Sequence, residues 1–413
     1  MFFSIYLGLK NLLRQKRRNI ITILVIAFSF LGYLFAESLM NGMEEMSFES
    51  IQNFETGNIQ IAEPDYWEER DELPIKGLVA WNEELEGIIG QTDGVIGVSP
   101  ELKFPANLNN GIDEMSIIGL GINPKKYNEV FQTGEYFIEG SLGTLNDNKA
   151  VIGTVLAELM DLKKDDHIIL LIRTKEDTFN TIDLEVGGII RTPNPMLNSR
   201  IVLMPLDIAQ RSLNVGDMVS MVSLKTSPAM PEKSIIKSLE DSFRVKKLSS
   251  QVYSWRESAA DVITLSTAKK GGAGAILSVV LLIGIVGIVN NIILSGIERT
   301  AEIGMMKALG MREWEIVLVF MVEAAGIGVL GGLASCLLGY LSVLWLVSSG
   351  FNVANFGDWS QYGIPIVDRI YGVWNCQAFL YIFVSSVAVA VLSSIWPSYW
   401  AARKDPVEAI YRH

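Results

Sequence analysis

Four charged residues fall in a short stretch of the chain between two long apolar runs. Glu298, Arg299 and Glu302 lie within about one helical turn, and Lys307 follows. Apolar side chains recur between the charges at helical spacing, at Ile303, Met306 and Leu309. The pattern predicts a short amphipathic helix ended by Gly310, with the first turn of another helix at residues 312–315. A charged helix tied to apolar runs at both ends offers a handle on which another protein can push.

Residue patterns for catalysis are missing elsewhere. The sequence has no G-x-x-x-x-G-K-[ST] phosphate loop, because the glycine-rich stretch at residues 271–274 lacks the Lys and Ser/Thr that would reach phosphate and metal. It has no G-x-S-x-G motif and only two histidines, His167 and His413. Its two cysteines, Cys336 and Cys376, fall in or beside apolar runs. We therefore expect a non-catalytic subunit without a cofactor or metal ligands, which takes energy from another protein.

Composition indicates a membrane protein with one large aqueous domain. The 413 residues are 49% hydrophobic with a mean hydropathy of +0.31, and the net charge is −12. The acidic residues concentrate between residues 41 and 268, whereas the remainder is net basic. An acidic domain has little with which to neutralise phosphates, so nucleic acid is not an expected partner.

Hydropathy and charge predict four membrane spans, at residues 19–40, 273–295, 316–347 and 376–397. A basic cluster at residues 10–18 precedes the first span, and Arg403 and Lys404 follow the last, which places both termini in the cytoplasm. The segments between the spans are then a cytoplasmic amphipathic segment (1–18), an extracytoplasmic domain (41–268), a cytoplasmic coupling loop (296–315), an extracytoplasmic loop (348–375) and a cytoplasmic tail (398–413). A secretory signal peptide is the alternative for the first run, but its length favours a retained helix.

The extracytoplasmic segment is expected to be an α+β domain with two lobes. Strand-like runs alternate with helical patterns, at 58–62, 95–99, 150–153, 167–173, 182–190, 201–204 and 218–225 for strands and at 81–90, 154–162, 205–213 and 231–243 for helices. Residues 253–270 have helical spacing, with Trp255, Ala259, Val262 and Ile263 on one face. They run nearly into the second span, so we expect a stalk helix.

Several residues within the spans are candidates for function. Glu323 lies in the third span, where a carboxylate either faces a partner group or is shallow enough to reach interfacial water. Asn290, near the end of the second span, is explained adequately by an interhelical hydrogen bond. Four bulky residues of the first span are possible substrate-facing residues, although lipid-facing side chains look the same: Phe28, Leu31, Tyr33 and Phe35.

The coupling stretch also resembles a known family. Glu298-Arg299, Glu302-Ile303-Gly304 and Lys307-Ala308-Leu309-Gly310, with Asn290 eight positions before Glu298, are similar to the coupling segment of the FtsX/MacB-type ABC transporter permeases. GNIQIAEPDYW, VIGTVLAELMDLKKDDHIILLI and IVLMPLDIAQRSL resemble the extracytoplasmic domain of the lipoprotein-releasing LolC/LolE members, and AARKDPVEAIYR resembles the end of the same family.

This resemblance implies a permease subunit in a bacterial inner membrane with a MacB-like periplasmic core domain. A dimer of separate ATPase subunits would bind ATP and magnesium and would dock on the coupling segment, and a second permease copy or relative would complete the complex. Lipoprotein release, with a carrier protein as a further partner, is the expected function. MacB-type efflux and FtsX-type regulation of cell-wall hydrolases are the alternatives within the family. A membrane-anchored binding or signalling protein without transport is the alternative from another class.

Overall fold

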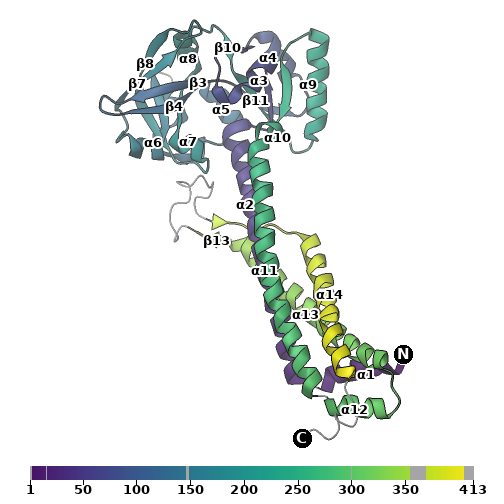
Figure 1. The fold of residues 1–413 in the computed structure, drawn as a ribbon. Helices are drawn as coiled ribbons and strands as arrows, with labels where there is room; N and C mark the ends of the chain where they lie inside the picture. Colours follow the sequence, from purple (N-terminus) through teal and green to yellow (C-terminus); the bar gives the residue numbers. More distant parts are fainter. Residues whose placement is uncertain (1, 15, 146–147, 299, 354–368, 404–413) are drawn as a thin grey trace. The chain divides into compact units, whose positions relative to one another are not determined.

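The computed structural model describes residues 2–14, 16–145, 148–298, 300–353 and 369–403, apart from some side chains near the N-terminus, from residue 273 onward in α11 and at residues 300, 301 and 401 (Figure 1). These residues form two compact units. The first holds residues 1–44, 265–352 and 369–413 and is rich in helix, and the second is built around residues 45–264.

The first unit contains the long apolar helices. Its elements are α1 (Phe2–Arg14), α2 (Lys16–Ile51), α11 (Ala260–Glu298), α12 (Thr300–Ala308), α13 (Glu313–Ser349) and α14 (Cys376–Ala402), with a short hairpin of β13 (Phe351–Asn352) and β14 (Arg369–Ile370). Within the described residues, three segments are long and apolar enough to cross a membrane: Asn19–Thr56, Glu313–Ser349 and Cys376–Trp400. The second predicted span, residues 273–295, lies in α11, where several side chains are outside the described part.

Small residues let three of these helices approach closely. A side chain added at Gly331 would place its Cβ 2.7 Å from Cγ2 of Ile26 in α2, and one at Gly328 would place it 2.9 Å from the Cα of Val387 in α14. The Ser386 hydroxyl of α14 donates to the Gly328 carbonyl at 3.1 Å. Close backbone approach through glycine and serine is how helices associate in lipid, where no hydrophobic force drives them together. The G-x-x-x-G of Gly328 and Gly332 is therefore a packing surface.

The second unit is an α+β domain, as the sequence predicts. Its strands are β1 (Ile59–Ala62), β2 (Val79–Ala80), β3 (Val95–Asn109), β4 (Glu114–Ile122), β5 (Phe137–Glu139), β6 (Lys149–Gly153), β7 (His167–Arg173), β8 (Phe179–Ile190), β9 (Ile201–Pro205), β10 (Met218–Val219), β11 (Met221–Thr226) and β12 (Gln251–Ser254). Its helices of five or more residues are α3 (Pro64–Glu68), α4 (Glu83–Gly90), α5 (Pro124–Val130), α6 (Thr154–Leu159), α7 (Pro195–Ser199), α8 (Leu206–Leu213) and α9 (Glu232–Lys246). Short turns complete it: η1 (Gln52–Thr56), η2 (Arg70–Glu72), η3 (Gly134–Tyr136), η4 (Leu142–Thr144) and α10 (Trp255–Ser258).

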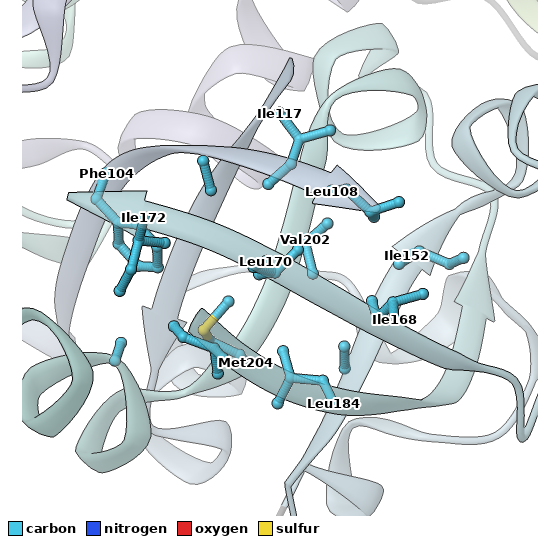
Figure 2. Packing of buried hydrophobic residues seen from close by; sticks show 14 of the residues in the cluster. Phe104, Leu108, Ile117, Ile152, Ile168, Leu170, Ile172, Leu184, Val202 and Met204 are labelled. Atoms are coloured by element: carbon cyan, nitrogen blue, oxygen red, sulfur yellow. The ribbon is translucent and has the colours of Figure 1, made fainter. Parts of the chain in front are cut away.

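Six of these strands close into a barrel. The pairing runs from β3 to β4, β9, β6, β8 and β7, and β7 pairs with β3 again. Successive side chains of a strand point to opposite faces, so every second residue enters the interior. Figure 2 shows aliphatic side chains of the barrel strands packed together in this interior, such as Leu108, Ile152, Leu170, Leu184 and Val202, all buried.

The other lobe is an open sheet in the order β12-β1-β11-β3. Helices α4 and α9 pack Leu85, Ile89, Leu239 and Phe243 on one face of it. Strand β3 belongs to both lobes, because its first half pairs with β11 and its second half pairs with β4 and β7. The two predicted lobes therefore share a strand.

One predicted boundary is wrong. The stalk helix was expected to start at residue 253, but Tyr253 and Ser254 end strand β12 and pair with Gln60 and Ile59 of β1. Helix begins at Trp255, and after a break at Ala259 it continues as α11. The Ser254 hydroxyl and the Glu257 carboxylate each accept a backbone N–H at this start, which is a capping box. Burial of Val252 and Tyr253 in the sheet outweighs their helical spacing.

Candidate functional site: the segment between α11 and α13

The segment from Thr300 to Glu315 folds as a short helix, a turn and the start of a long helix. The amide of Leu309 donates to the Met305 carbonyl at 3.0 Å, and that of Met311 donates to the Met306 carbonyl at 3.1 Å, which closes α12. Gly310 follows with φ of +86°, a left-handed conformation that glycine adopts without strain. The Glu315 carboxylate then accepts the amide of Arg312 at 3.0 Å and caps α13.

Two of the predicted coupling residues point inward. Ile303 is 1% exposed and packs in a cluster with Ile316, Phe320 and Ala402. Gly304 beside it is also buried. Burying a side chain such as Ile303 contributes roughly 1.5–3 kcal/mol. These two residues therefore seat α12 on α13 and leave the contact with a partner to the opposite face.

The opposite face is apolar and exposed. Leu309 is 86% exposed and Met305, one helical turn earlier, is 54% exposed. Ala308 and Gly310 are exposed as well. Beside them lies a groove of about 410 Å³, lined by Leu7, Met306, Leu309, Gly310, Met311 and Glu315. Exposed apolar residues that cluster next to a groove are typical of a protein contact site.

Two ion pairs fix charges around this face. A guanidinium nitrogen of Arg14 lies 3.4 Å from Oε1 of Glu302, and Nζ of Lys307 lies 3.8 Å from Oε1 of Glu313. The Arg14–Glu302 pair is largely solvent-exposed and contributes less than about 1 kcal/mol. Its role is to place charge rather than to hold the fold. Arg299 and the side chain of Glu298 lie outside the described residues.

Glu323 is buried, with 4% of its surface exposed. Helix α1 covers this part of α13: a Cβ added at Gly8 would lie 2.8 Å from the Val319 carbonyl, and one at Gly326 would lie 2.3 Å from Leu12. A carboxylate enclosed by protein meets protein groups, so of the two interpretations the structure favours a partner group over interfacial water.

The remaining predicted residues are not gathered into one site. Phe28 is 62% exposed, whereas Leu31, Tyr33 and Phe35 are half-buried. The Tyr33 ring lies 6.2 Å from that of Tyr381 in α14. Asn290 is exposed on α11.

The sequence interpretation missed Met305, Leu7 and Arg14. Met305 carries a usable signal, because it lies one helical turn from Leu309. The apolar spacing grouped Leu309 with Ile303 and Met306, but Leu309 is exposed and shares the outward face with Met305. Leu7 and Arg14 carry none, since their contribution depends on α1 meeting a segment about 300 residues away in the chain.

Two family descriptions match the chain. The MacB-like periplasmic core domain matches residues 20–242, and the FtsX-like permease C-terminal region matches residues 274–406. Both matches lie over the parts that the resemblance indicated. They describe the broad family and not the LolC/LolE type, which stays a prediction.

Individual relatives are distant but cover nearly the whole chain. The macrolide export ATP-binding/permease protein MacB 2 of Aeromonas hydrophila is 25% identical over 98% of this chain, and the chain spans 60% of its length. The uncharacterized ABC transporter permease YknZ of Bacillus subtilis is 24% identical over 98% of both chains. The crystal structure of the periplasmic region of MacB from Actinobacillus actinomycetemcomitans is 12% identical, with a TM-score of 0.37 over 53% of this chain and 96% of that one.

The domain that precedes α11 and the helices from α11 to α14 thus each match a part of one family. In YknZ the same two parts make up nearly the entire protein, and its name is that of a permease. The chain therefore belongs to the FtsX/MacB family of ABC transporter permeases, as a multi-pass protein of a cell membrane with a MacB-like periplasmic core domain.

Proposed function

We propose that this permease couples ATP hydrolysis by a separate pair of ATPase subunits to mechanical work on a substrate outside the membrane. The exposed face of Met305 and Leu309 beside the groove carries the proposal, because it offers an apolar contact with flanking charges on the segment between two long apolar helices. The ATPase subunits would bind ATP and magnesium. A second copy of this chain, or a related permease, would supply the second docking segment.

The two helices that would carry the movement are anchored in the extracytoplasmic domain. Near the end of α2, Phe48 contacts Trp255 at the start of α10, with ring centroids 5.4 Å apart, and Ile51 and Ala259 join the same cluster. Within the helical unit, Glu44 of α2 forms an ion pair with Lys270 of α11 and accepts a hydrogen bond from Ser266 at 3.0 Å. Rigid helices tied to a domain transmit displacement, which supports mechanical coupling over a channel.

A kink between α10 and α11 should uncouple ATP hydrolysis from transport of the substrate. The amide of Ala259 donates to the Trp255 carbonyl at 2.9 Å, and that of Ile263 donates to the Ala259 carbonyl at 2.9 Å. Prolines at 259 and 263 remove both bonds. The cost approaches about 3 kcal/mol only inside a helix, so it is smaller at residue 259, where α10 already ends, than at residue 263 in α11. We expect ATP hydrolysis by the complex to persist while release or export of substrate falls at least about tenfold. Ile263→Ala is the control, since it shortens the side chain and keeps the amide; near-normal transport by the proline variant would make α11 a tether only.

The orientation in the membrane gives a simpler expectation. A reporter that is active only outside the cytoplasm should work when fused after residue 150, and a cytoplasmic reporter should work after residue 305. The basic residues before α2 and after α14 are the physical reason, because positive charge is retained on the cytoplasmic side. A cytoplasmic signal at residue 150 contradicts the whole proposal.

For the substrate we propose lipoprotein release, on the resemblance of GNIQIAEPDYW and IVLMPLDIAQRSL to LolC/LolE-type permeases. Export of small amphiphilic molecules is the second candidate, and the names of the relatives support it, since MacB 2 is named a macrolide export protein. Mass spectrometry of material that co-purifies with the complex, trapped with a hydrolysis-deficient ATPase, distinguishes them: acylated protein supports the first and small amphiphiles the second. A chain that captures no ATPase would instead be a membrane-anchored binding or signalling protein.

A further inference from the structure

A buried carboxyl group lies where the two extracytoplasmic lobes meet. Glu101 of β3 is 1% exposed. It pairs with Met221, at one end of the β11 register, and with Ile122, at one end of the β4 register. Glu101 therefore marks the position at which β3 leaves the open sheet and enters the barrel.

Two tyrosines bury this position. Tyr66 of α3 packs with Met221, and Tyr127 of α5 packs with Ile122. Both rings are at most 1% exposed. Met221 and Ile122, the two residues opposite Glu101, thus each belong to a cluster that contains one of these rings. The two clusters shield the junction from solvent.

Several buried polar atoms at this junction lack hydrogen-bond partners. Within the described residues, Oε1 of Glu101 and the hydroxyls of Ser99, Ser223, Tyr66 and Tyr127 have no hydrogen-bond partner. Ser99 and Ser223 are directly opposite each other on β3 and β11, next to Glu101. Burying an ionised carboxylate with so few partners is costly, and such groups bind a proton instead.

Two charged residues influence Glu101. Nζ of Lys103, two residues along β3, lies 3.9 Å from its Oε2. Glu55 belongs to η1, the turn that follows α2, and accepts a hydrogen bond from Asn194 at 3.3 Å. Burial raises the pKa of Glu101 to about 7; Lys103 and the nearby Ser223 hydroxyl oppose this, and Glu55 adds to it. Burial also raises the pKa of Tyr66 to about 12 and that of Tyr127, so both tyrosines stay neutral.

We propose that Glu101 is a proton-binding residue that locks the two lobes together, and that Glu55 links its charge to the end of α2. Protonation removes the buried charge and lets the carboxyl group act as a donor to the neighbouring hydroxyls. Ionisation adds a second negative charge within the electrostatic range of Glu55, and the repulsion acts on η1. Helix α2 contains the first predicted span, and η1 continues directly from it. A proton that binds to Glu101 therefore affects both the junction between the lobes and the end of α2.

The sign of the pH dependence follows from the raised pKa. The folded junction holds a proton up to about pH 7, whereas an exposed glutamate loses it near pH 4.5. The stabilisation is therefore complete below about pH 4.5 and decreases as pH rises toward 7, by about tenfold in the opening equilibrium per pH unit. Above about pH 7 it levels off at its lowest value.

Hydrogen exchange of the full chain in nanodiscs, corrected for the intrinsic pH dependence of exchange, tests this between about pH 4.5 and 8.5. In the wild type, peptides covering β3 and β11 should lose protection as pH rises and level off near pH 7. Glu101→Gln should remove this slope. Glu55→Gln should lower the pH at which protection levels off, because Glu55 raises the pKa of Glu101. Lys103→Met should raise that pH, because Lys103 lowers the same pKa. Glu114→Gln, at an exposed site on β4, should match the wild type.

A wild-type profile without the slope overturns the proposal, and so does a slope that survives in a folded Glu101→Gln variant. If Glu101→Gln fails to fold, the other two variants decide, because they keep Glu101; shifts in the same direction would contradict the assignment. None of these measurements uses ATP hydrolysis, so their outcome is separate from that of the proposed function.

Discussion

Leu309→Asp is expected to weaken binding of the ATPase about thirtyfold while the permease still inserts and folds. Leu309 is 86% exposed, so the change removes no buried contact of the chain itself. In a complex it would place a charge in the apolar contact beside the groove. A loss of about 2 kcal/mol, the size found for the few dominant residues of an interface, is about thirtyfold in affinity. The measurement is the dissociation constant of the purified ATPase for the permease in nanodiscs.

A control variant and a second variant of the docking segment accompany this test. Ile112→Asp changes an apolar residue of the extracytoplasmic domain that is 90% exposed, and it should leave ATPase affinity unchanged. Glu302→Lys reverses the charge that Arg14 faces and should also weaken the complex. A bulky residue at Gly304 tests something different, since this glycine is buried and the variant would disturb the seating of α12 first. Unchanged affinity in both Leu309→Asp and Glu302→Lys would mean that the segment is not the docking site.

Gly328→Leu should produce the largest loss of stability in the membrane unit. Besides the Cβ of Ala390 at 3.0 Å, an added Cβ would meet the Cα of Val387 at 2.9 Å and the Ser386 carbonyl oxygen at 3.0 Å. Both are backbone atoms, which a rotamer change cannot move, so α13 and α14 must separate. Overpacking of this kind costs about 1–3 kcal/mol, and the loss of the Ser386 hydrogen bond adds to it. Thermal unfolding in detergent, followed at several protein concentrations, measures the effect.

Gly32→Leu is the matched control for this variant. Gly32 lies in α2, and an added Cβ would meet no atom of the chain within 4 Å. Its melting temperature should stay at or above that of the wild type, because leucine is the better helix former. Equal losses in the two variants would show that glycine itself, and not the close approach of α13 and α14, sets stability.

Periodicity predicted the elements whose pattern is regular. Strands β7 and β9 and the long helices α13 and α14 follow their sequence patterns to within a few residues. The prediction for strand β3 ends at residue 99, and the residues beyond it carry local signals against a buried strand, since Pro100 and Pro105 lack a backbone N–H and Glu101 is charged. All three lie inside the strand. Pairing with three other strands outweighs these local signals, and such pairing is not visible in a single stretch of sequence.

The candidate site shows the same limit. Motif and spacing located the segment, and the turn at Gly310 followed from glycine's tolerance of positive φ. The motif did not say that Ile303 and Gly304 face inward, since that depends on where α13 and α14 lie. It also did not indicate that α1 contributes Leu7 and Arg14. Contacts between segments far apart in the chain need the tertiary structure.

The open sheet has a consequence for how the protein is made. Among the described residues, strand β1 pairs with β11 (residues 221–226) and β12 (residues 251–254), so the whole barrel is synthesised between β1 and its partner strands. Until those strands cross the membrane, β1 has two unpaired edges, and such edges invite aggregation and proteolysis. Translocation that stalls after the barrel would leave a folded barrel beside an unfinished sheet. We expect biogenesis to depend on chaperones outside the membrane that shield β1 until the last part of the domain arrives.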